Sequence, residues 1–351
     1  MGVLRPAAGG RLTRRGALLS GAAGLAVANL DGCSTSAGLG GQAGARPLTP
    51  HEAALDAPDP TEVIALWPNG APGGEKVTVT EAVVPRPPPA GMRDRYREHT
   101  REPTLTVFRP ARPNGSAVIL APGGGYVRVV LDKEGYETAR YLASRGYTCF
   151  VLMYRLPGDG WAAGPDVALQ DVQRAVRIVR ARAASYGVKP DRIVVQGFSA
   201  GGHVASSAIT RFDEAVYAPV DAADRQSARP DLGCLCYPVI ALSGALAHPG
   251  SAEAMFGKAA ATPEEIRRTS AEAHVTAQTP PTILFHAQDD PTVPVANSMV
   301  MFAALKAANV KCELHIFEEG QHGWGLRGIE GKPCAEWPIL FVNWMKRHGF
   351  E

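Results

Sequence analysis

A single serine lies between glycines directly after an apolar run, in the stretch VVQGFSAGGHV from Val194 to Val204. The pattern G-x-S-x-G around Ser199 is typical of a nucleophilic serine on a sharp turn between a strand and a helix. In a chain with 38 glycines the pattern alone is weak support, because a small residue in a tight turn looks the same. Covalent chemistry at Ser199 also requires a base, an acid that orients the base, and donors that stabilise an oxyanion.

The downstream sequence supplies both the base and the acid. Asp289 and Asp290 follow the apolar run PTILFHA, and His322 lies in a glycine-flanked loop after the run KCELHIF. The chain order Ser, Asp, His is the order found when this triad is carried by a mainly parallel sheet. A surface loop histidine and a structural turn aspartate are the alternatives. We predict that His322 is the base and that one of the two aspartates orients it.

A glycine-rich turn upstream fits the oxyanion donors. Gly123 to Gly125 directly follow the apolar run SAVILAP. Their N–H groups, unhindered by side chains, are predicted to bind the oxygen of a tetrahedral intermediate together with the N–H of Ala200. A phosphate-binding loop is the alternative for such a turn, but no G-K-[ST] follows it.

Strand and helix patterns alternate around these residues. Apolar, β-favouring runs lie at residues 104–110, 116–122, 148–154, 192–198, 234–240, 281–287 and 311–317. Helical patterns lie at residues 132–146, 166–187, 201–212, 298–310 and 337–349. The alternation predicts an α/β fold with a mainly parallel central sheet and helices on both faces. Active sites of such sheets gather at the carboxyl ends of the strands, where the predicted catalytic loops would meet. No lipase-like lid is evident, and short segments at 157–165 and 210–230 are expected to frame the entrance.

The amino terminus predicts export. Arg14 and Arg15 precede an uncharged run over residues 16–30, which is shorter than the roughly 20 apolar residues of a membrane-spanning helix. The pair resembles a twin-arginine signal, with an ordinary Sec signal as the alternative. Residues 1–33 are therefore expected to be an export signal. Cleavage after Ala28 and lipidation of Cys33 in a lipobox-like LDGC, the one expected route to a membrane, both stay open.

Composition sets further limits. Residues 34–60 are rich in Gly, Ala and Pro and are expected to form a flexible tether before a catalytic domain at 61–351. Without the four arginines that precede position 29, the chain has 32 basic and 34 acidic residues, so no basic stripe suggests nucleic acid. The six cysteines form no spaced framework and no zinc-like Cys/His spacing. No cofactor or metal is expected.

These stretches together resemble the α/β-hydrolase family and, within it, bacterial esterases related to acetylxylan esterases. The resemblance covers roughly residues 63 to 349 and includes PGGGYVRVVLDKEG, QGFSAGGHVAS, TPPTILFHAQDDPTVPVANS and FEEGQHGWGL. It implies the triad Ser199, Asp290 and His322, because the family's D-x-x-V-P turn reads DPTVP from Asp290.

The resemblance also implies that Gly124 and Gly125 are the oxyanion donors of the glycine loop. Pro122 stands where related lipases have the His of an H-G-G-G motif, which departs from the hormone-sensitive lipases. Tyr126 and Trp324 flank the predicted catalytic loops, where a pocket wall and core packing are both open. His203, just after the turn, is expected to pack within its helix.

The resemblance implies a serine carboxylesterase acting on short acyl esters, above all acetyl, of xylan-type polysaccharides or oligosaccharides, and the amino terminus adds the expectation that it is exported. Its partners would be acylated carbohydrates or other small esters, with no nucleic acid. An exported serine peptidase of dipeptidyl-peptidase type, a general short-chain esterase or lipase, and a noncatalytic glycan-binding protein are the alternatives.

Overall fold

A computed structural model describes residue 2 and residues 46–87, 91–258 and 261–351. The expected export signal, including Arg14, Arg15, Ala28 and Cys33, lies outside the described residues. Gly44–Glu351 is one compact unit of the chain.

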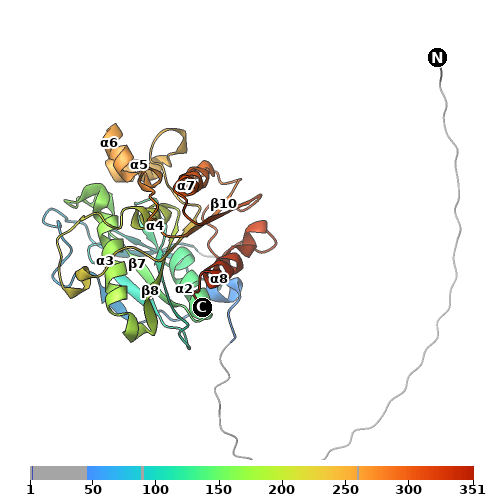
Figure 1. The fold of residues 1–351 in the computed structure, drawn as a ribbon, viewed down its shortest axis with the longest axis horizontal. Coiled ribbons are helices and arrows are strands. Elements are labelled where there is room, and N and C mark those ends of the chain that lie inside the picture. The colour runs from blue at the N-terminus through green and yellow to red at the C-terminus, as the bar shows by residue number, and fades with distance from the viewer. Residues whose placement is uncertain (1, 3–45, 88–90, 259–260) are drawn as a thin grey trace, which may run out of the picture. The chain divides into compact units, whose positions relative to one another are not determined.

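An eight-stranded sheet forms the centre of this unit, with the strand order β1-β4-β7-β5-β8-β9-β10-β11 (Figure 1). The six strands from β7 to β11 in this order run parallel, and β1 and β4 are antiparallel to their neighbours. The strands are β1 (Val63–Ala65), β4 (Thr104–Phe108), β5 (Gly115–Ala121), β7 (Thr148–Met153), β8 (Val188–Phe198), β9 (Leu232–Cys236), β10 (Thr282–Ala287) and β11 (Cys312–Phe317). This sheet confirms the predicted mainly parallel architecture.

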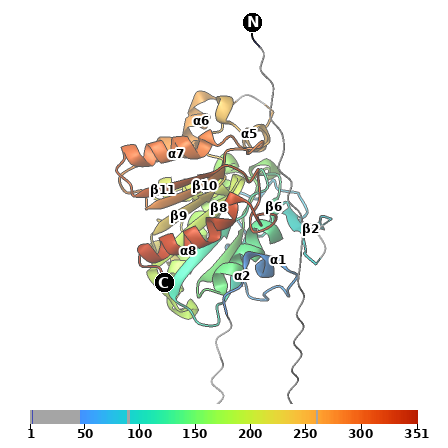
Figure 2. The same ribbon diagram turned by 90° about the vertical axis from the view of Figure 1, so that its right-hand side faces the viewer.

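Helices cover both faces of the sheet. On one face lie α2 (Glu137–Ala143) and α8 (Trp337–Arg347). On the other lie α3 (Val167–Ala181), α4 (Ala200–Thr210) and α7 (Ala296–Ala307) (Figure 1). Figure 2 shows α7 and α8 on opposite sides of β10 and β11. Both faces of the central strands are therefore buried, as their continuous apolar runs predict.

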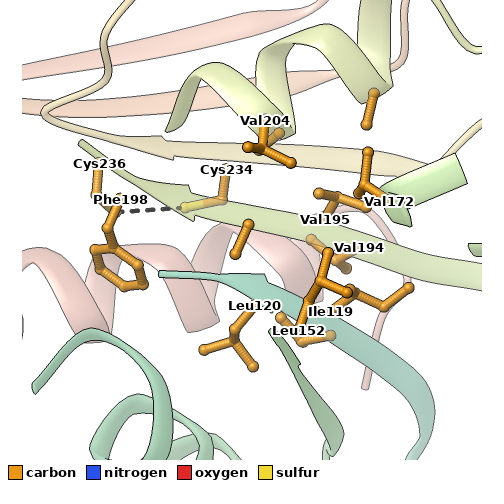
Figure 3. Packing of buried hydrophobic residues seen from close by; sticks show 14 of the residues in the cluster. Ile119, Leu120, Leu152, Val172, Val194, Val195, Phe198, Val204, Cys234 and Cys236 are labelled. Carbon is orange, nitrogen blue, oxygen red and sulfur yellow. Dashed lines mark hydrogen bonds between the residues drawn. The ribbon is translucent and has the colours of Figure 1, made fainter. Parts of the chain in front are cut away.

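The core between the central strands and α3 and α4 is aliphatic. Figure 3 shows Ile119, Leu152 and Val195 of the sheet packed with Val172 of α3 and Val204 of α4. All five side chains are buried. A close-packed core fixes the carboxyl ends of the strands, and the loops that follow them inherit that rigidity.

A second, three-stranded antiparallel sheet, which we call the small sheet, lies beside the glycine loop at residues 123–125. It contains β2 (Ala82–Pro85), β3 (Arg95–Glu98) and β6 (Val129–Val130) in the order β2-β3-β6. β2 and β3 lack a long alternating pattern and β6 has two residues, so the sequence does not predict this sheet. Two further helices missed from the sequence are α5 (Pro249–Phe256) and α6 (Pro263–Thr269).

The amino-terminal boundary of the domain also differs from the expected one. Residues 50–54 form helix α1 (Pro50–Ala54), capped by Thr49, with Ala53 and Ala54 buried. The Leu48 N–H donates to Ser144 Oγ at 2.9 Å, which holds this segment near the end of α2. The expected tether up to residue 60 is therefore corrected for residues 46–60, where a capping box and buried alanines stabilise packed structure.

No helix in the described ranges is long and apolar enough to cross a bilayer. The five cysteines in those ranges are free thiols, and Cys234 Sγ lies 3.9 Å from Cys236 Sγ on β9.

Candidate active site

The turn at Ser199 joins β8 to α4. Ser199 has φ 54° and ψ −120°, an unusual conformation for a residue with a side chain. A Cβ atom on Gly201 would lie 2.1 Å from Ala121 O, so only glycine allows α4 to approach β5 this closely. The turn predicted from G-x-S-x-G is present, and it places Ser199 at the carboxyl end of the central strand.

Ser199, His322 and Asp290 form a continuous hydrogen-bonded chain. Ser199 Oγ lies 2.9 Å from His322 Nε2, and His322 Nδ1 lies 2.7 Å from Asp290 Oδ2. Asp290 Oδ2 accepts from Nδ1–H, so Nε2 is the free acceptor for the seryl proton. The Asp290 side chain is fully buried, while the His322 side chain is 16% exposed. The three residues thus have the arrangement of a nucleophile, a base and an orienting acid.

A second histidine, His286, supports Asp290 from inside β10. Its Nε2 lies 3.2 Å from Asp290 Oδ2 and 3.1 Å from Val293 O, and its Nδ1 lies 2.8 Å from Ser298 Oγ. Because both neighbours of Nε2 are acceptors, Nε2 carries the proton. Burial alone would raise the pKa of Asp290, but hydrogen bonds from His286 and His322 outweigh it and hold that pKa well below the ordinary value.

The neighbouring Asp289 has a different position. Its Oδ1 accepts from the N–H groups of Gly320 at 3.0 Å and Gln321 at 2.8 Å. Asp289 therefore anchors the loop that carries His322, and Asp290 contacts the imidazole. This geometry shows that Asp290, and not Asp289, contacts His322, which the local sequence pattern alone does not decide.

The glycine loop after β5 lies against the same turn. Gly124 has φ 136°, and a Cβ atom there would lie 2.1 Å from Arg128 O, so the position requires glycine. Gly124 and Gly125 line a pocket with Ser199, and Ala200 follows Ser199 as the first residue of α4. The first N–H groups of a helix lack intrahelical acceptors, which leaves Ala200 available to an oxyanion. The structure thus gathers all six residues predicted for the site.

A buried carboxylate, Glu134, braces the glycine loop. Glu134 Oε2 accepts from the Gly123 N–H at 2.8 Å, and Oε1 accepts from Tyr237 Oη at 3.0 Å. Tyr237 Oη in turn accepts from the Gly325 N–H at 3.0 Å. This chain of hydrogen bonds connects the glycine loop to the loop that carries His322. Sequence reasoning missed Glu134 and Tyr237, because their partners lie far away along the chain.

Tyr126 and His203 form another buried connection. Tyr126 Oη lies 2.7 Å from His203 Nδ1, and His203 Nε2 lies 2.6 Å from Thr269 O. Because Thr269 O can only accept, His203 donates from Nε2 and accepts from Tyr126. Burial lowers the pKa of His203 to about 4. Tyr126 and Trp324 were expected either to form a pocket wall or to pack in the core. Tyr126 is 2% exposed and Trp324 is 3% exposed, so the structure supports core packing.

The pocket that contains Ser199 and His322 has a volume of about 310 Å³, and we call it the active-site pocket. It is lined by Arg86, Gly124, Gly125, Val127, Arg128, Val130, Lys133, Glu134, Ser199, His248, Gly250, Thr292, His322 and Gly323. The segments at 157–165 and 210–230 contribute nothing to this lining, so the expectation that they frame the entrance is wrong. The small sheet and the start of α5 take that place instead.

His248 is a pocket residue that the sequence did not single out. Its Nδ1 accepts from the Ser251 N–H at 3.1 Å, which caps α5 and leaves the proton on Nε2. Burial lowers its pKa, and nearby His322 lowers it further. A solitary histidine before a proline carries no sequence signal that would place it in the active-site pocket.

Within the described residues, no group of three or more His, Cys, Asp or Glu side chains could hold a metal ion. A larger cavity of about 990 Å³ lies near the amino ends of β5 and β7, lined in part by Leu48, Phe108 and Ser144. It lacks the triad and the glycine loop, so we place the chemistry in the smaller active-site pocket.

Known proteins with similar sequences and structures are named as esterases or hydrolases, and one relative is named an endo-1,4-beta-xylanase. The acetylxylan esterase of Xylanibacter ruminicola is 33% identical over 225 residues, which are 63% of this chain and 43% of that protein. The chain spans less than two thirds of the length of the curated relatives it matches.

Two solved structures extend the comparison. The acetyl ester-xyloside bifunctional hydrolase of Caldicellulosiruptor lactoaceticus is 34% identical with a TM-score of 0.67, over 83% of this chain and 98% of that chain. The propionate-bound esterase Est2 of Thermogutta terrifontis is 28% identical with a TM-score of 0.57, over 71% of this chain and 90% of that chain.

The family match itself covers residues 105–305, from β4 to α7. This range includes the glycine loop, Ser199 and Asp290, and it is more than half of the chain. The chain therefore belongs to the BD-FAE family, and its fold is that of the α/β-hydrolases.

Proposed function

We propose that this protein is a serine carboxylesterase that hydrolyses short acyl esters through an acyl-enzyme on Ser199. The observation that carries the proposal is the contact chain from Ser199 Oγ through His322 to Asp290, with distances of 2.9 and 2.7 Å. Esterase names among the relatives and structural neighbours support the same reaction class.

Acylation begins when Ser199 Oγ attacks the ester carbonyl carbon. His322 Nε2 takes the seryl proton, and buried Asp290 stabilises the resulting imidazolium while holding its orientation. The carbonyl oxygen becomes an oxyanion that accepts hydrogen bonds from the N–H groups of Gly124, Gly125 and Ala200. Losing one such donor typically costs about 3–4 kcal/mol of transition-state stabilisation. Collapse of the intermediate then releases the alcohol, which receives its proton from His322.

Deacylation reverses these roles with water in place of the alcohol. His322 removes a proton from the water as it attacks the acyl-enzyme, and the same N–H groups bind the second oxyanion. The acid departs when Ser199 Oγ takes back a proton from His322. The hydrogen-bonded network through Glu134 and Tyr237 holds both loops in place through the two steps.

For the substrate, we propose acetyl esters of xylan-type polysaccharides or oligosaccharides. An acetylxylan esterase among the relatives and an acetyl ester-xyloside hydrolase among the structural neighbours support this choice. A pocket of about 310 Å³ shared by the acyl group, the alcohol and water favours a small acyl group.

Two measurements test the proposal together. A fluorophosphonate probe should label the enzyme at Ser199, located by peptide mass spectrometry, and Ser199→Ala should abolish labelling and turnover of p-nitrophenyl acetate. Acetate release from acetylated xylan then tests the natural ester. Labelling at another residue would reject the nucleophile. Efficient hydrolysis of aminoacyl amides without acetate release would favour a peptidase instead.

A further inference from the structure

Among the residues that the structure describes, three cationic side chains line the active-site pocket, against one carboxylate. Arg86, Arg128 and Lys133 are the cations, and Glu134 is the carboxylate. The chain as a whole is nearly balanced, with 36 basic and 34 acidic residues. The excess of positive charge in this pocket is thus a local property, and it requires a local explanation.

Arg86 differs from the other two cations, because Asp94 partly neutralises it. The Arg86 Nη2 atom lies 2.6 Å from Asp94 Oδ1. Its guanidinium also lies 5.7 Å from the centre of the Tyr96 ring, while that of Arg128 lies 5.0 Å from the same ring. Tyr96 therefore positions both guanidinium groups at the wall formed by the small sheet.

Arg128 has no carboxylate within 4.0 Å among the residues that the structure describes, and its buried Nε atom has no hydrogen-bond partner there. The turn that carries it is fixed to the glycine loop, because the Val127 and Arg128 N–H groups lie 3.2 and 3.3 Å from Gly124 O. Arg128 thus presents an unpaired charge beside the oxyanion donors.

Lys133 supplies the second unpaired charge, beside the base. Its Nζ atom lies 4.0 Å from the point where a Cβ atom on Gly323 would be, directly after His322. In the described ranges it makes neither an ion pair nor a side-chain hydrogen bond. The alcohol of an ester leaves toward His322, which protonates it, so Lys133 lies on the alcohol side of the pocket.

Glu134 does not neutralise these two cations by direct contact. Its carboxylate oxygens accept from the Gly123 N–H and from Tyr237 Oη, and no cation in the described structure lies within 4.0 Å of them. Arg128 and Lys133 thus remain available to a ligand. An uncompensated cation in a partly desolvated pocket favours a bound anion.

We propose that Arg128 and Lys133 form a subsite for a carboxylate on the alcohol part of the ester. The inference rests on the proposed esterase function and adds a substrate class to it, namely acyl esters of alcohols that carry a carboxylate, such as a uronic acid unit in an oligosaccharide. Lys133 beside His322 places the anion on the departing alcohol.

A matched pair of phenyl acetates tests this subsite. The anionic ester is 4-acetoxybenzoate and the neutral ester is 4-acetoxybenzamide, which release phenols of similar size. We expect the wild-type enzyme to prefer the anion by about tenfold in kcat/KM, corrected for the spontaneous hydrolysis rates of the two esters. The preference should shrink in 1 M NaCl, where the Debye length falls to about 3 Å.

Two variants and their matched controls locate the effect. Arg128→Gln and Lys133→Gln should each lower the anion-to-neutral ratio by roughly threefold to fivefold. Arg182→Gln and Lys189→Gln remove the same charges from exposed positions outside the pocket and should leave the ratio unchanged. A ratio that is equal in wild type and all four variants would overturn the proposal. A preference for p-nitrophenyl hydrogen glutarate over p-nitrophenyl butyrate, with none for 4-acetoxybenzoate, would overturn the placement on the alcohol.

Binding to Ser199→Ala separates this proposal from the reaction itself. Calorimetry or NMR with 4-hydroxybenzoate and 4-hydroxybenzamide measures the anion preference without turnover. Tighter binding of the benzoate that depends on Arg128 and Lys133 supports the subsite even if the wild type hydrolyses neither ester. Equal binding rejects the subsite even if esterase activity is found.

Discussion

Asp290 Oδ2 accepts from two imidazoles, because His286 Nε2 lies 3.2 Å and His322 Nδ1 lies 2.7 Å from that one oxygen. The backbone N–H groups of Thr292 and Val293 donate to Oδ1 at 2.8 and 2.9 Å. Four donors thus keep Asp290 ionised in a buried position, where it fixes the orientation of His322.

Replacing His286 tests how much this second imidazole contributes. His286→Leu removes one charge-assisted hydrogen bond without changing the triad, so the free energy of unfolding should fall by about 1.5–3 kcal/mol. Because the stabilised group is a carboxylate with a lowered pKa, its contribution is present above pH 4 and is lost as pH falls further. The kcat on p-nitrophenyl acetate should fall far less than in Asp290→Asn, for which about 10⁴-fold is expected. Equal losses in the two variants would contradict this assignment.

The conformation of Ser199 gives a prediction about stability. Its φ of 54° and ψ of −120° are costly for a residue with a Cβ atom, and glycine tolerates them. Ser199→Gly should therefore be more stable than Ser199→Ala, by about 1 kcal/mol after the extra entropy of an unfolded glycine is counted. Both variants should lose at least about 10⁴-fold in kcat. Urea unfolding compares their stabilities, and a more stable alanine variant would show that the turn is unstrained.

Buried His203 predicts a loss of stability in mild acid. Its pKa is lowered to about 4 by burial, with smaller opposing effects from the Thr269 carbonyl and Asp166, and a lowering effect of Arg211. The unfolded chain binds a proton near pH 6.5, so this group destabilises the fold as pH falls from 6.5 toward 4, by about 3 kcal/mol in total. His203→Gln keeps a donor and an acceptor but does not titrate. Its unfolding free energy should decline less than that of the wild type between pH 7 and pH 4.5, and an identical decline would assign the acid sensitivity to other groups.

The small pocket predicts the acyl preference. The kcat/KM for p-nitrophenyl acetate should exceed that for p-nitrophenyl octanoate, because each misfitted methylene costs about 1–3 kcal/mol in discrimination. A chain-length series from acetate to octanoate measures this directly. Highest kcat/KM on octanoate would favour the lipase-like alternative.

Export remains a prediction from the sequence. Replacing Arg14 and Arg15 with Lys should leave the precursor in the cytoplasm if the signal is of the twin-arginine type. Cell fractionation measures the distribution, and unchanged export would indicate a Sec signal. Mass spectrometry of the mature amino terminus distinguishes cleavage after Ala28 from a lipid on Cys33.

Residues with strong local patterns were predictable from the sequence. The apolar runs predicted the strands of the main sheet from β4 to β11, and each triad residue follows a strand whose carboxyl end faces the same edge. The order of Ser199, Asp290 and His322 along the chain was therefore enough to bring their loops together in the prediction. Parallel pairing aligns the carboxyl ends of these strands, and this places the three loops at one edge of the sheet.

The residues that the sequence did not reveal have no local pattern that marks their role. His286 lies in an apolar strand, where the sequence does not distinguish it from a packed core histidine. Only the structure shows that its side chain contacts Asp290, four residues away. Glu134 and Tyr237 meet across 103 positions of the chain. The two-residue strand β6 has no pattern of its own, and pairing with β3 alone defines it.

The wall made by β2 and β3 has a consequence for how such enzymes diverge. Arg86 and Tyr96 belong to residues that precede the range shared with the family, 105–305, whereas Ser199 and Asp290 lie within it. Strand β3 pairs with β6 beside the glycine loop, and the small sheet supplies none of the strands that carry the triad. Part of the entrance wall is thus encoded apart from Ser199 and Asp290, while Arg128 and Lys133 lie within the shared range. Substitutions or insertions between residues 82 and 98 can remodel the entrance for a new alcohol while the inherited reaction is left intact.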